Sequence, residues 1–186
     1  MMNIITWNIR GLNDKSKQRI LRDCIKEESP DILMLQETKC AGMEAKNIFQ
    51  CIWKGCNYIH TDSAGASGGL AILWNPNHTI LSGPFSTTGT LSAHFEVIGS
   101  NQEGTITNVY GPQGQQEKIK FMERMTRVKS LATTPNWILG SDFNMIMSLE
   151  EKTGGSKRLE QDSGKFKTLL EQLKLVDIEN SNGTFT

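Results

Sequence analysis

The stretch "NWILGSDFNMI", Asn136 to Ile146, combines a core-like segment with two polar side chains. The short apolar run Trp137–Leu139 passes through Gly140 and is followed by Asp142 and Asn144, two residues apart. A run of this length between turn residues is typical of a buried strand. If the segment stays extended, the acid and the amide face the same way, because side chains alternate along a strand. The stretch therefore predicts a strand that brings two polar groups to one side of its end.

Three other apolar runs end in a comparable way. Asn8 follows "IITW", Glu37 follows "ILMLQ" and Tyr110 closes "TNVY". Ligands of α/β sheets gather outside strand ends, where loops carry the chemistry on a rigid base. Taken singly, an Asn is a turn former, a Glu is a solvated loop end or helix cap, and a Tyr is a core aromatic. Together they predict an oxygen-rich site that suits a hard cation such as Mg²⁺.

The order of apolar patterns predicts an α/β fold. Strands over Asn3–Trp7 and Asp31–Glu37 flank a helix over Lys17–Glu28, which Asp14 or Ser16 caps. A strand, a helix and a strand within so short a span predict a crossover with the two strands parallel. Further strands are expected at Leu70–Asn75, Ser92–Ile98 (half-exposed) and Gly104–Pro112, and further helices at Glu44–Trp53, Gln115–Leu131 and Gln161–Leu173.

Helical spacing predicts which side chains face the core. The expected inward positions are Ile20, Leu21, Cys24 and Ile25 in the first helix, Ile119, Met122, Met125, Val128 and Leu131 in the long helix, and Phe166, Leu169, Leu170 and Leu173 in the last.

Composition indicates one globular domain over residues 1–186. Hydrophobic residues make up 37% and charged residues 22%, and 20 basic residues balance 20 acidic ones. A zero net charge argues against broad attraction to nucleic acid but leaves room for a local basic groove. No apolar run is long enough for a membrane helix and no secretory signal is recognisable, so we expect an intracellular protein of the nucleus or cytoplasm. The cysteines and histidines lack zinc-ligand spacing.

The Gly/Ser-rich segment Ser63–Gly69 is a further candidate for a ligand loop. It lacks the G-x-x-x-x-G-K-[ST] pattern of a phosphate-binding loop, and no Lys follows it. A flexible turn is the favoured interpretation.

The segments "TWNIRGL", "LMLQET", "NVYGP" and "ILGSDFN" resemble the endonuclease/exonuclease/phosphatase superfamily over Ile4–Thr186. Within it, they are most similar to the endonuclease domain at the N-terminus of plant LINE-like (non-LTR) retrotransposon polyproteins. The resemblance implies two packed β-sheets with helices on both outer sides, a four-layer sandwich. It also implies phosphoester hydrolysis that depends on Mg²⁺, with Mn²⁺ as a second candidate ion. In the retroelement subgroup the substrate is DNA, whose nicked 3′-hydroxyl primes a reverse transcriptase fused in the same polyprotein.

The resemblance assigns roles to the residues already singled out. Glu37 would be the principal metal ligand, and Asn8 would support the metal site. Asp142 would position or deprotonate the attacking water. The remaining assignments are phosphate contacts: Asn144 to the phosphate or to Asp142, Tyr110 to a phosphate oxygen, and Lys39 as a weaker candidate because a lone Lys beside a loop is often only solvated.

The chain departs from the family pattern in three respects, the first of which is Ser141 in "GSDFN", where a second small residue is more usual. Arg10 stands where many repair-type relatives carry an acid. After Thr186 the superfamily continues to an Asp and a Ser-Asp-His strand, and the three histidines of the chain precede that region. We therefore expect a domain with its last strands missing that is inactive or weakly active by itself. The alternatives are a phosphatase of the same superfamily that acts on a small phosphate ester, and a non-catalytic remnant.

Overall fold

The computed structural model of the chain describes residues 2–63, 68–145 and 163–178. It divides into two compact units, one of Met1–Tyr110 with Ala132–Asp142 and the other of Gly111–Leu131 with Phe143–Thr186. The first unit contains every strand of the described residues and the first two helices. Within the described ranges, no helix has the length and apolar character needed to cross a membrane.

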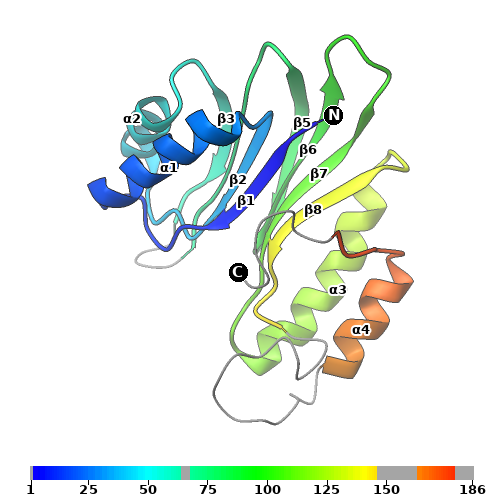
Figure 1. The fold of residues 1–186 in the computed structure, drawn as a ribbon. Helices are drawn as coiled ribbons and strands as arrows, with labels where there is room; N and C mark the ends of the chain where they lie inside the picture. Colours follow the sequence, from blue (N-terminus) through cyan, green and yellow to red (C-terminus); the bar gives the residue numbers. More distant parts are fainter. Residues whose placement is uncertain (1, 64–67, 146–162, 179–186) are drawn as a thin grey trace. The chain divides into compact units, whose positions relative to one another are not determined.

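The first sheet contains four strands in the order β1-β2-β4-β3 (Figure 1). They are β1 (Ile4–Asn8), β2 (Ile32–Gln36), β3 (Asn57–Thr61) and β4 (Leu70–Trp74). β1 and β2 are parallel, which confirms the predicted crossover, and β4 is antiparallel to β2. The central strands β2 and β4 are buried throughout, whereas β1 is only half-buried because it lies at the edge.

Two helices pack against one face of this sheet, namely α1 (Lys15–Glu28) and α2 (Gly42–Ile52). The side chain of Asp14 accepts a hydrogen bond from the Ser16 N–H at 2.8 Å, so Asp14 is the cap of α1. Leu21 and Ile25 are buried as predicted. The expectation for Ile20 was wrong, since Ile20 is 54% exposed.

The second sheet has the order β5-β6-β7-β8. Its strands are β5 (Thr79–Thr87), β6 (Thr90–Val97), β7 (Glu103–Tyr110) and β8 (Trp137–Asp142). β7 and β8 are parallel and pair Tyr110 with Asp142. Over the predicted span Ser92–Ile98 the exposure is mixed as expected, since Ser92, Ala93 and Phe95 are buried whereas Glu96 and Ile98 are exposed; the residues of β6 before it, Thr90 and Leu91, are buried.

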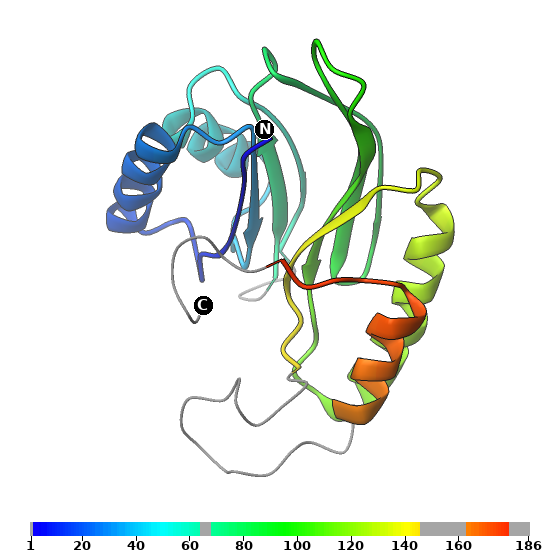
Figure 2. The same ribbon diagram turned by 45° about the vertical axis from the view of Figure 1, so that its right-hand side comes forward.

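The two sheets pack face to face in the first unit (Figure 2). Their shared core joins Met34 and Ile72 of the first sheet to Leu91, Phe95 and Ile106 of the second. Burial of such side chains contributes about 1.5–3 kcal/mol each. The predicted α/β fold of two packed sheets with flanking helices is confirmed.

The second unit contains α3 (Gln115–Leu131) and α4 (Ser163–Gln172). The ring of Phe143 contacts the rings of Phe121 and Phe166, with centroids 6.4 and 5.0 Å away. α3 has the predicted bounds, but Ile119 and Leu131 are exposed, whereas Phe121 is buried. The first predicted residues of the last helix and most of Ser63–Gly69 lie outside the described residues.

Candidate functional site

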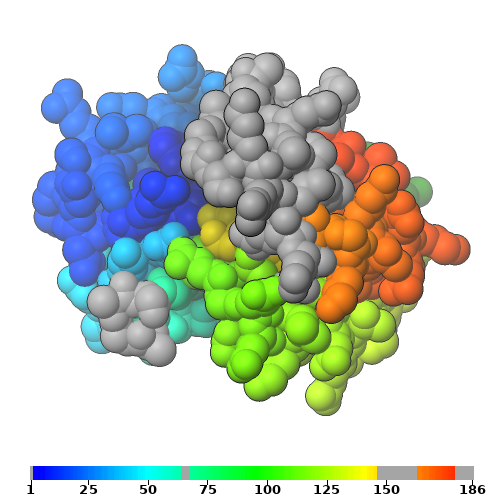
Figure 3. All heavy atoms as spheres, turned by 90° about the horizontal axis from the view of Figure 1, so that it is seen from below, coloured from blue at the N-terminus to red at the C-terminus, as the bar shows by residue number. Residues whose placement is uncertain are grey.

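Four strands of the first unit terminate at one edge. β1 ends at Asn8, Glu37 directly follows β2, and β7 and β8 end at Tyr110 and Asp142. The parallel registers pair Asn8 with Gln36 and Tyr110 with Asp142, so the polar ends lie at matching heights. Figure 3 views the molecule from this end, where the yellow end of β8 lies beside the blue residues around the end of β1.

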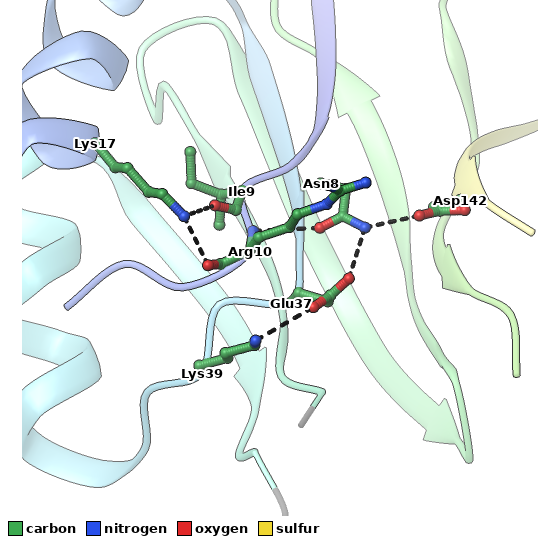
Figure 4. A network of polar contacts seen from close by, with 7 residues as sticks. All are labelled: Asn8, Ile9, Arg10, Lys17, Glu37, Lys39 and Asp142. Carbon is green, nitrogen blue, oxygen red and sulfur yellow. Dashed lines mark hydrogen bonds and ion pairs between the residues drawn. The ribbon is translucent and has the colours of Figure 1, made fainter. Parts of the chain in front are cut away.

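The amide of Asn8 connects the two sheets (Figure 4). Its Nδ2 donates one hydrogen bond to Glu37 Oε1 at 2.9 Å and another to Asp142 Oδ2 at 2.7 Å. Its Oδ1 accepts from the Arg10 N–H at 3.2 Å. Both amide hydrogens and the amide oxygen are thereby engaged, which fixes the orientation of the side chain. The structure thus brings together Asn8, Glu37 and Asp142 in one row, which we call the Asn8–Glu37–Asp142 row.

Glu37 is held in a left-handed backbone conformation, with φ 51°. That region is unfavourable for a residue other than glycine and costs about 1–3 kcal/mol. The neighbouring loop imposes it, because Gly11 N–H donates to the Glu37 carbonyl at 2.7 Å and Leu12 N–H donates to the Thr38 carbonyl at 2.8 Å. The backbone of the site is therefore set by pairing between the loops that follow β1 and β2.

The charge of Glu37 is favoured by its surroundings. Partial burial disfavours the carboxylate, but hydrogen bonds from Asn8 and the Tyr110 side chain, together with the ammonium of Lys39, outweigh it and lower the pKa of Glu37. Lys39 Nζ lies 3.6 Å from Glu37 Oε2, and the Glu37 side chain is 16% exposed. The Tyr110 side chain is therefore hydrogen-bonded to the carboxylate of Glu37, and the ammonium of Lys39 lies beside that carboxylate. The phosphate contacts predicted for Tyr110 and Lys39 stay predictions.

Asn144 does not continue the geometry of β8. The strand ends at Asp142, and Asn144 has φ 52°, so the hypothesis of an extended segment through both residues was wrong. Within the second unit, the Asn144 amide donates to the carbonyl of Gly111 at 2.7 Å. A Cβ on Gly111 would collide with the backbone of Phe143, which explains the glycine in "YGP".

The family is decided by its sequence model, which matches residues 5–185. The chain belongs to the Endonuclease/Exonuclease/phosphatase family. A curated relative is the Transposon TX1 uncharacterized 149 kDa protein of Xenopus laevis, 23% identical over 181 residues. That match covers 95% of this chain and 14% of the transposon protein. The chain therefore spans about a seventh of the length of this relative.

Solved structures share the fold of this Endonuclease/Exonuclease/phosphatase chain. AP endonuclease LMAP from Leishmania major matches with a TM-score of 0.68 and 17% identity, over 92% of this chain and 66% of that one. An AP endonuclease from Archaeoglobus fulgidus matches with a TM-score of 0.65 and 22% identity, over 92% and 71%. The endonuclease domain of TRAS1, a telomere-specific non-LTR retrotransposon, matches with a TM-score of 0.65 and 16% identity. The match covers 93% of this chain and 71% of the TRAS1 domain.

A buried polar network supports the site of this family member, and sequence reasoning missed it. Gln36 Nε2 donates to Thr6 Oγ1 at 3.0 Å and to Asn108 Oδ1 at 2.6 Å. Asn108 Nδ2 in turn donates to the carbonyls of Leu35 and Ala71, both at 2.9 Å. The network joins β1, β2, β4 and β7 directly behind Glu37 and Tyr110. The sequence feature that could have predicted this network is a Gln and an Asn inside otherwise apolar strands, because a buried polar side chain needs hydrogen-bond partners.

Gly140 was recognised only as part of the strand, and its packing role was missed. A Cβ at this position would overlap the end of Met34 and lie 2.9 Å from Thr6 Oγ1. The absence of a side chain lets β8 approach β1 and β2 closely. Asp142 follows two residues later and reaches Asn8.

The donor set fits a hard divalent ion. Glu37 and Asp142 supply carboxylate oxygens and Asn8 an amide oxygen, and Mg²⁺ commonly takes one or two carboxylates, with waters and substrate phosphate completing its shell. Among the described residues, no group of three or more His, Cys, Asp or Glu side chains could hold a metal ion. Glu37 and Asp142 are the two carboxylates that the Asn8 amide brings together.

The lowered pKa of Glu37 makes its contribution to stability pH-dependent. A carboxyl whose folded pKa lies below its ordinary value of 4.5 stabilises the fold above that value, and the contribution is lost as pH falls through the folded pKa. In metal-free buffer with EDTA, we expect the wild-type advantage over Glu37→Gln in free energy of unfolding to be constant near neutral pH and to shrink below 4.5. Urea unfolding at several pH values measures it.

The exposed residue Glu27 of α1 provides the matched control for this experiment. Glu27→Gln removes one carboxylate away from the site. Its difference from wild type in free energy of unfolding is subtracted from that of Glu37→Gln at each pH. An advantage over Glu37→Gln that is unchanged, or larger, at low pH would contradict the direction of the Glu37 pKa.

Proposed function

We propose that this chain is a divalent-metal-dependent phosphodiesterase domain that nicks DNA for a retrotransposon. The observation that carries the proposal is the Asn8 amide, which bridges the carboxylates of Glu37 and Asp142 at 2.9 and 2.7 Å across two sheets. The similarity to a protein named as a transposon product supports the retroelement assignment. The proposal includes residues 1–186 as one domain, a reverse transcriptase in the same polyprotein, and work on DNA in the nucleus or cytoplasm.

Each residue of the row has a distinct chemical task in this proposal. Glu37 would hold Mg²⁺ or Mn²⁺, with Asn8 beside it to fix the direction of the carboxylate. When bound, the ion would shield the phosphate and stabilise the charge that develops on it. Asp142 would accept a proton from a water placed between the row and the phosphate, as the oxygen of that water attacks phosphorus.

The reaction balances as a simple hydrolysis. The attacking oxygen forms a new bond to phosphorus, and the bond from phosphorus to the 3′-oxygen breaks. The 3′-oxygen takes up a proton to become the hydroxyl that primes DNA synthesis, and the phosphate stays on the 5′ side. Tyr110 holds Glu37 through its side chain. Lys39 and Asn144 are the further candidates for phosphate contacts.

We expect the 186-residue chain alone to nick DNA weakly or not at all. The resemblance assigns a phosphate contact to a Ser-Asp-His strand, and the chain has three histidines that contact other groups. His60 lies near Asp62, His78 binds Asp31, and His94 lies near Glu96 and Glu103. Loss of one charge-stabilising donor costs about 10²–10³ in rate.

Supercoiled plasmid tests the proposal directly. The purified chain at high concentration is incubated with plasmid and either Mg²⁺, Mn²⁺ or EDTA, in parallel with Glu37→Ala and Asp142→Ala. The expected result is slow or undetectable relaxation, and any relaxation requires the ion and disappears in both variants. Robust nicking that disappears in both variants would support the function and refute the expectation of weak activity.

If no nicking is detected, a measurement of metal binding separates a metal-dependent domain from a non-catalytic remnant. Calorimetric titration with Mn²⁺ should detect binding by wild type, because Glu37, Asp142 and Asn8 supply oxygen donors before any substrate is present and water can fill the other positions. No Mn²⁺ binding together with no nicking would overturn the metal-dependent function and favour a non-catalytic remnant. Hydrolysis of small phosphomonoesters without nicking of DNA would favour the phosphatase alternative.

A further inference from the structure

Arg10 has a backbone that is held on both sides. Its N–H donates to Asn8 Oδ1 at 3.2 Å, and its carbonyl accepts from Lys17 Nζ at 2.7 Å. Lys17 also donates to the Ile9 carbonyl at 2.9 Å. Arg10 has φ 51°, a conformation that an arginine rarely adopts unless its surroundings impose it. The hydrogen bonds of the Arg10 backbone to Asn8 and Lys17 therefore set the direction in which the Arg10 side chain leaves the loop.

The guanidinium of Arg10 is available to a ligand. The residue is exposed, and its side chain extends toward the Asp142 side of the network (Figure 4). Among the residues that the structure describes, no ion pair or side-chain hydrogen bond of Arg10 is found. A positive group that is placed beside two carboxylates and bound to neither of them is positioned for an anion from outside.

The charges around the row indicate the kind of anion. Lys39 lies beside Glu37, and Lys17 is occupied by two backbone carbonyls, so both cations already have contacts within the loop. Arg10 adds a positive charge that would repel a metal ion in its immediate vicinity. Its planar guanidinium carries parallel N–H groups, whose spacing matches the two non-bridging oxygens of a phosphate.

We propose that Arg10 is a substrate-binding residue that takes a phosphate group of the DNA strand beside the Asn8–Glu37–Asp142 row. The inference rests on the proposed function and adds a phosphate contact at a position where related repair-type sequences carry an acid. Asn8 couples the two halves of the site, since one side chain orients Glu37 and Asp142 and fixes the backbone of Arg10. The ion and the phosphate would thus be placed by a shared residue.

The salt dependence of DNA binding measures phosphate contacts directly. Fluorescence anisotropy with a short labelled duplex, in EDTA so that no strand is cut, gives the affinity between about 50 and 200 mM salt. Each phosphate contact contributes about 0.9 to the slope of log affinity against log salt. For Arg10→Gln we expect that loss of slope and about tenfold weaker binding, as for one charge-assisted contact. Arg10→Lys should keep the slope and recover part of the affinity.

Two variants separate contact from fold and from charge. Arg10→Gly removes the side chain but suits the left-handed backbone, so it should bind as weakly as Arg10→Gln while its urea midpoint stays near that of wild type. Arg19→Gln, at an exposed position on α1, removes the same charge away from the row and should keep the wild-type slope. If Arg10→Gln binds as Arg19→Gln does, the proposal is overturned.

Competition with inorganic phosphate, at constant ionic strength, tests whether Arg10 binds a phosphate group of DNA or a phosphate group in general. If Arg10 contacts a phosphate, inorganic phosphate should displace the duplex from wild type at a lower concentration than from Arg10→Gln. That result supports the phosphate contact. Suppose wild type binds no duplex but binds phosphate, by calorimetry, more tightly than Arg10→Gln does. DNA as substrate would then fail, and Arg10 would still be a phosphate residue. Equal phosphate affinity of the two proteins, with no duplex binding, would overturn both.

Discussion

Replacing Glu37 with alanine is expected to lower the affinity for Mn²⁺ by at least about 100-fold, since loss of an outer-sphere partner alone costs about 10–100-fold. Glu37 is the carboxylate that the structure keeps charged, through Asn8, Tyr110 and Lys39. Its backbone is also held in an unfavourable conformation by hydrogen bonds between the loops that follow β1 and β2. Calorimetric titration of the metal-free chain with Mn²⁺ provides the measurement.

Asp142→Asn is the matched variant for this titration. It removes a carboxylate from the same row, and its amide oxygen can still accept the hydrogen bond that Asn8 donates at 2.7 Å. If Glu37 is the principal ligand, Asp142→Asn should lose less than about tenfold in Mn²⁺ affinity, whereas its effect should fall on turnover, where a general base contributes about 10²–10⁴-fold. Equal losses in Glu37→Ala and Asp142→Asn would mean that both carboxylates bind the ion alike.

The convergence of polar strand ends was predictable because it follows from parallel strands. A crossover makes β1 and β2 parallel, so Asn8 and the residue after Gln36 had to lie at the same edge. Apolar runs of the right length identified β1, β2, β7 and β8, and Asn8 at the end of β1 donates hydrogen bonds to Glu37 after β2 and to Asp142 at the end of β8. The chemistry of the residues at those ends then limited the kind of site.

The parts that the sequence did not reveal depend on tertiary context. β3 and β5 are mixed in polarity, with a Gly-Pro pair inside β5, so neither shows a clear period of two. Ile20 and Ile119 obey helical spacing but lie just outside the arc that packing covers. The left-handed conformations of Arg10 and Glu37 come from pairing between two loops, which no local pattern encodes.

Gly140→Val is expected to destabilise the first unit by about 1–3 kcal/mol or more, the range found when a packed core is overfilled. An added Cβ would overlap Met34, which is 1% exposed, and would lie 2.9 Å from Thr6 Oγ1. Relief requires β8 to move away from β1, and that movement would break the hydrogen bond between Asn8 and Asp142. Urea unfolding measures the stability, and Mn²⁺-dependent nicking measures the site wherever wild type shows it.

Gly140→Ala separates steric overlap from the general effect of a new methyl group. Gly164 of α4 has no atom within 4 Å of an added Cβ, so Gly164→Ala should be neutral or stabilising, by about 0.4–1 kcal/mol. A double-mutant cycle with Met34→Ala completes the test, because removing the Met34 side chain makes room for the methyl group. The combined loss should be smaller than the sum by about 0.5–3 kcal/mol, the coupling expected of residues in contact. Strict additivity would show that Gly140 does not hold β8 against Met34, and the close approach of the two sheets at Asn8 would then need another cause.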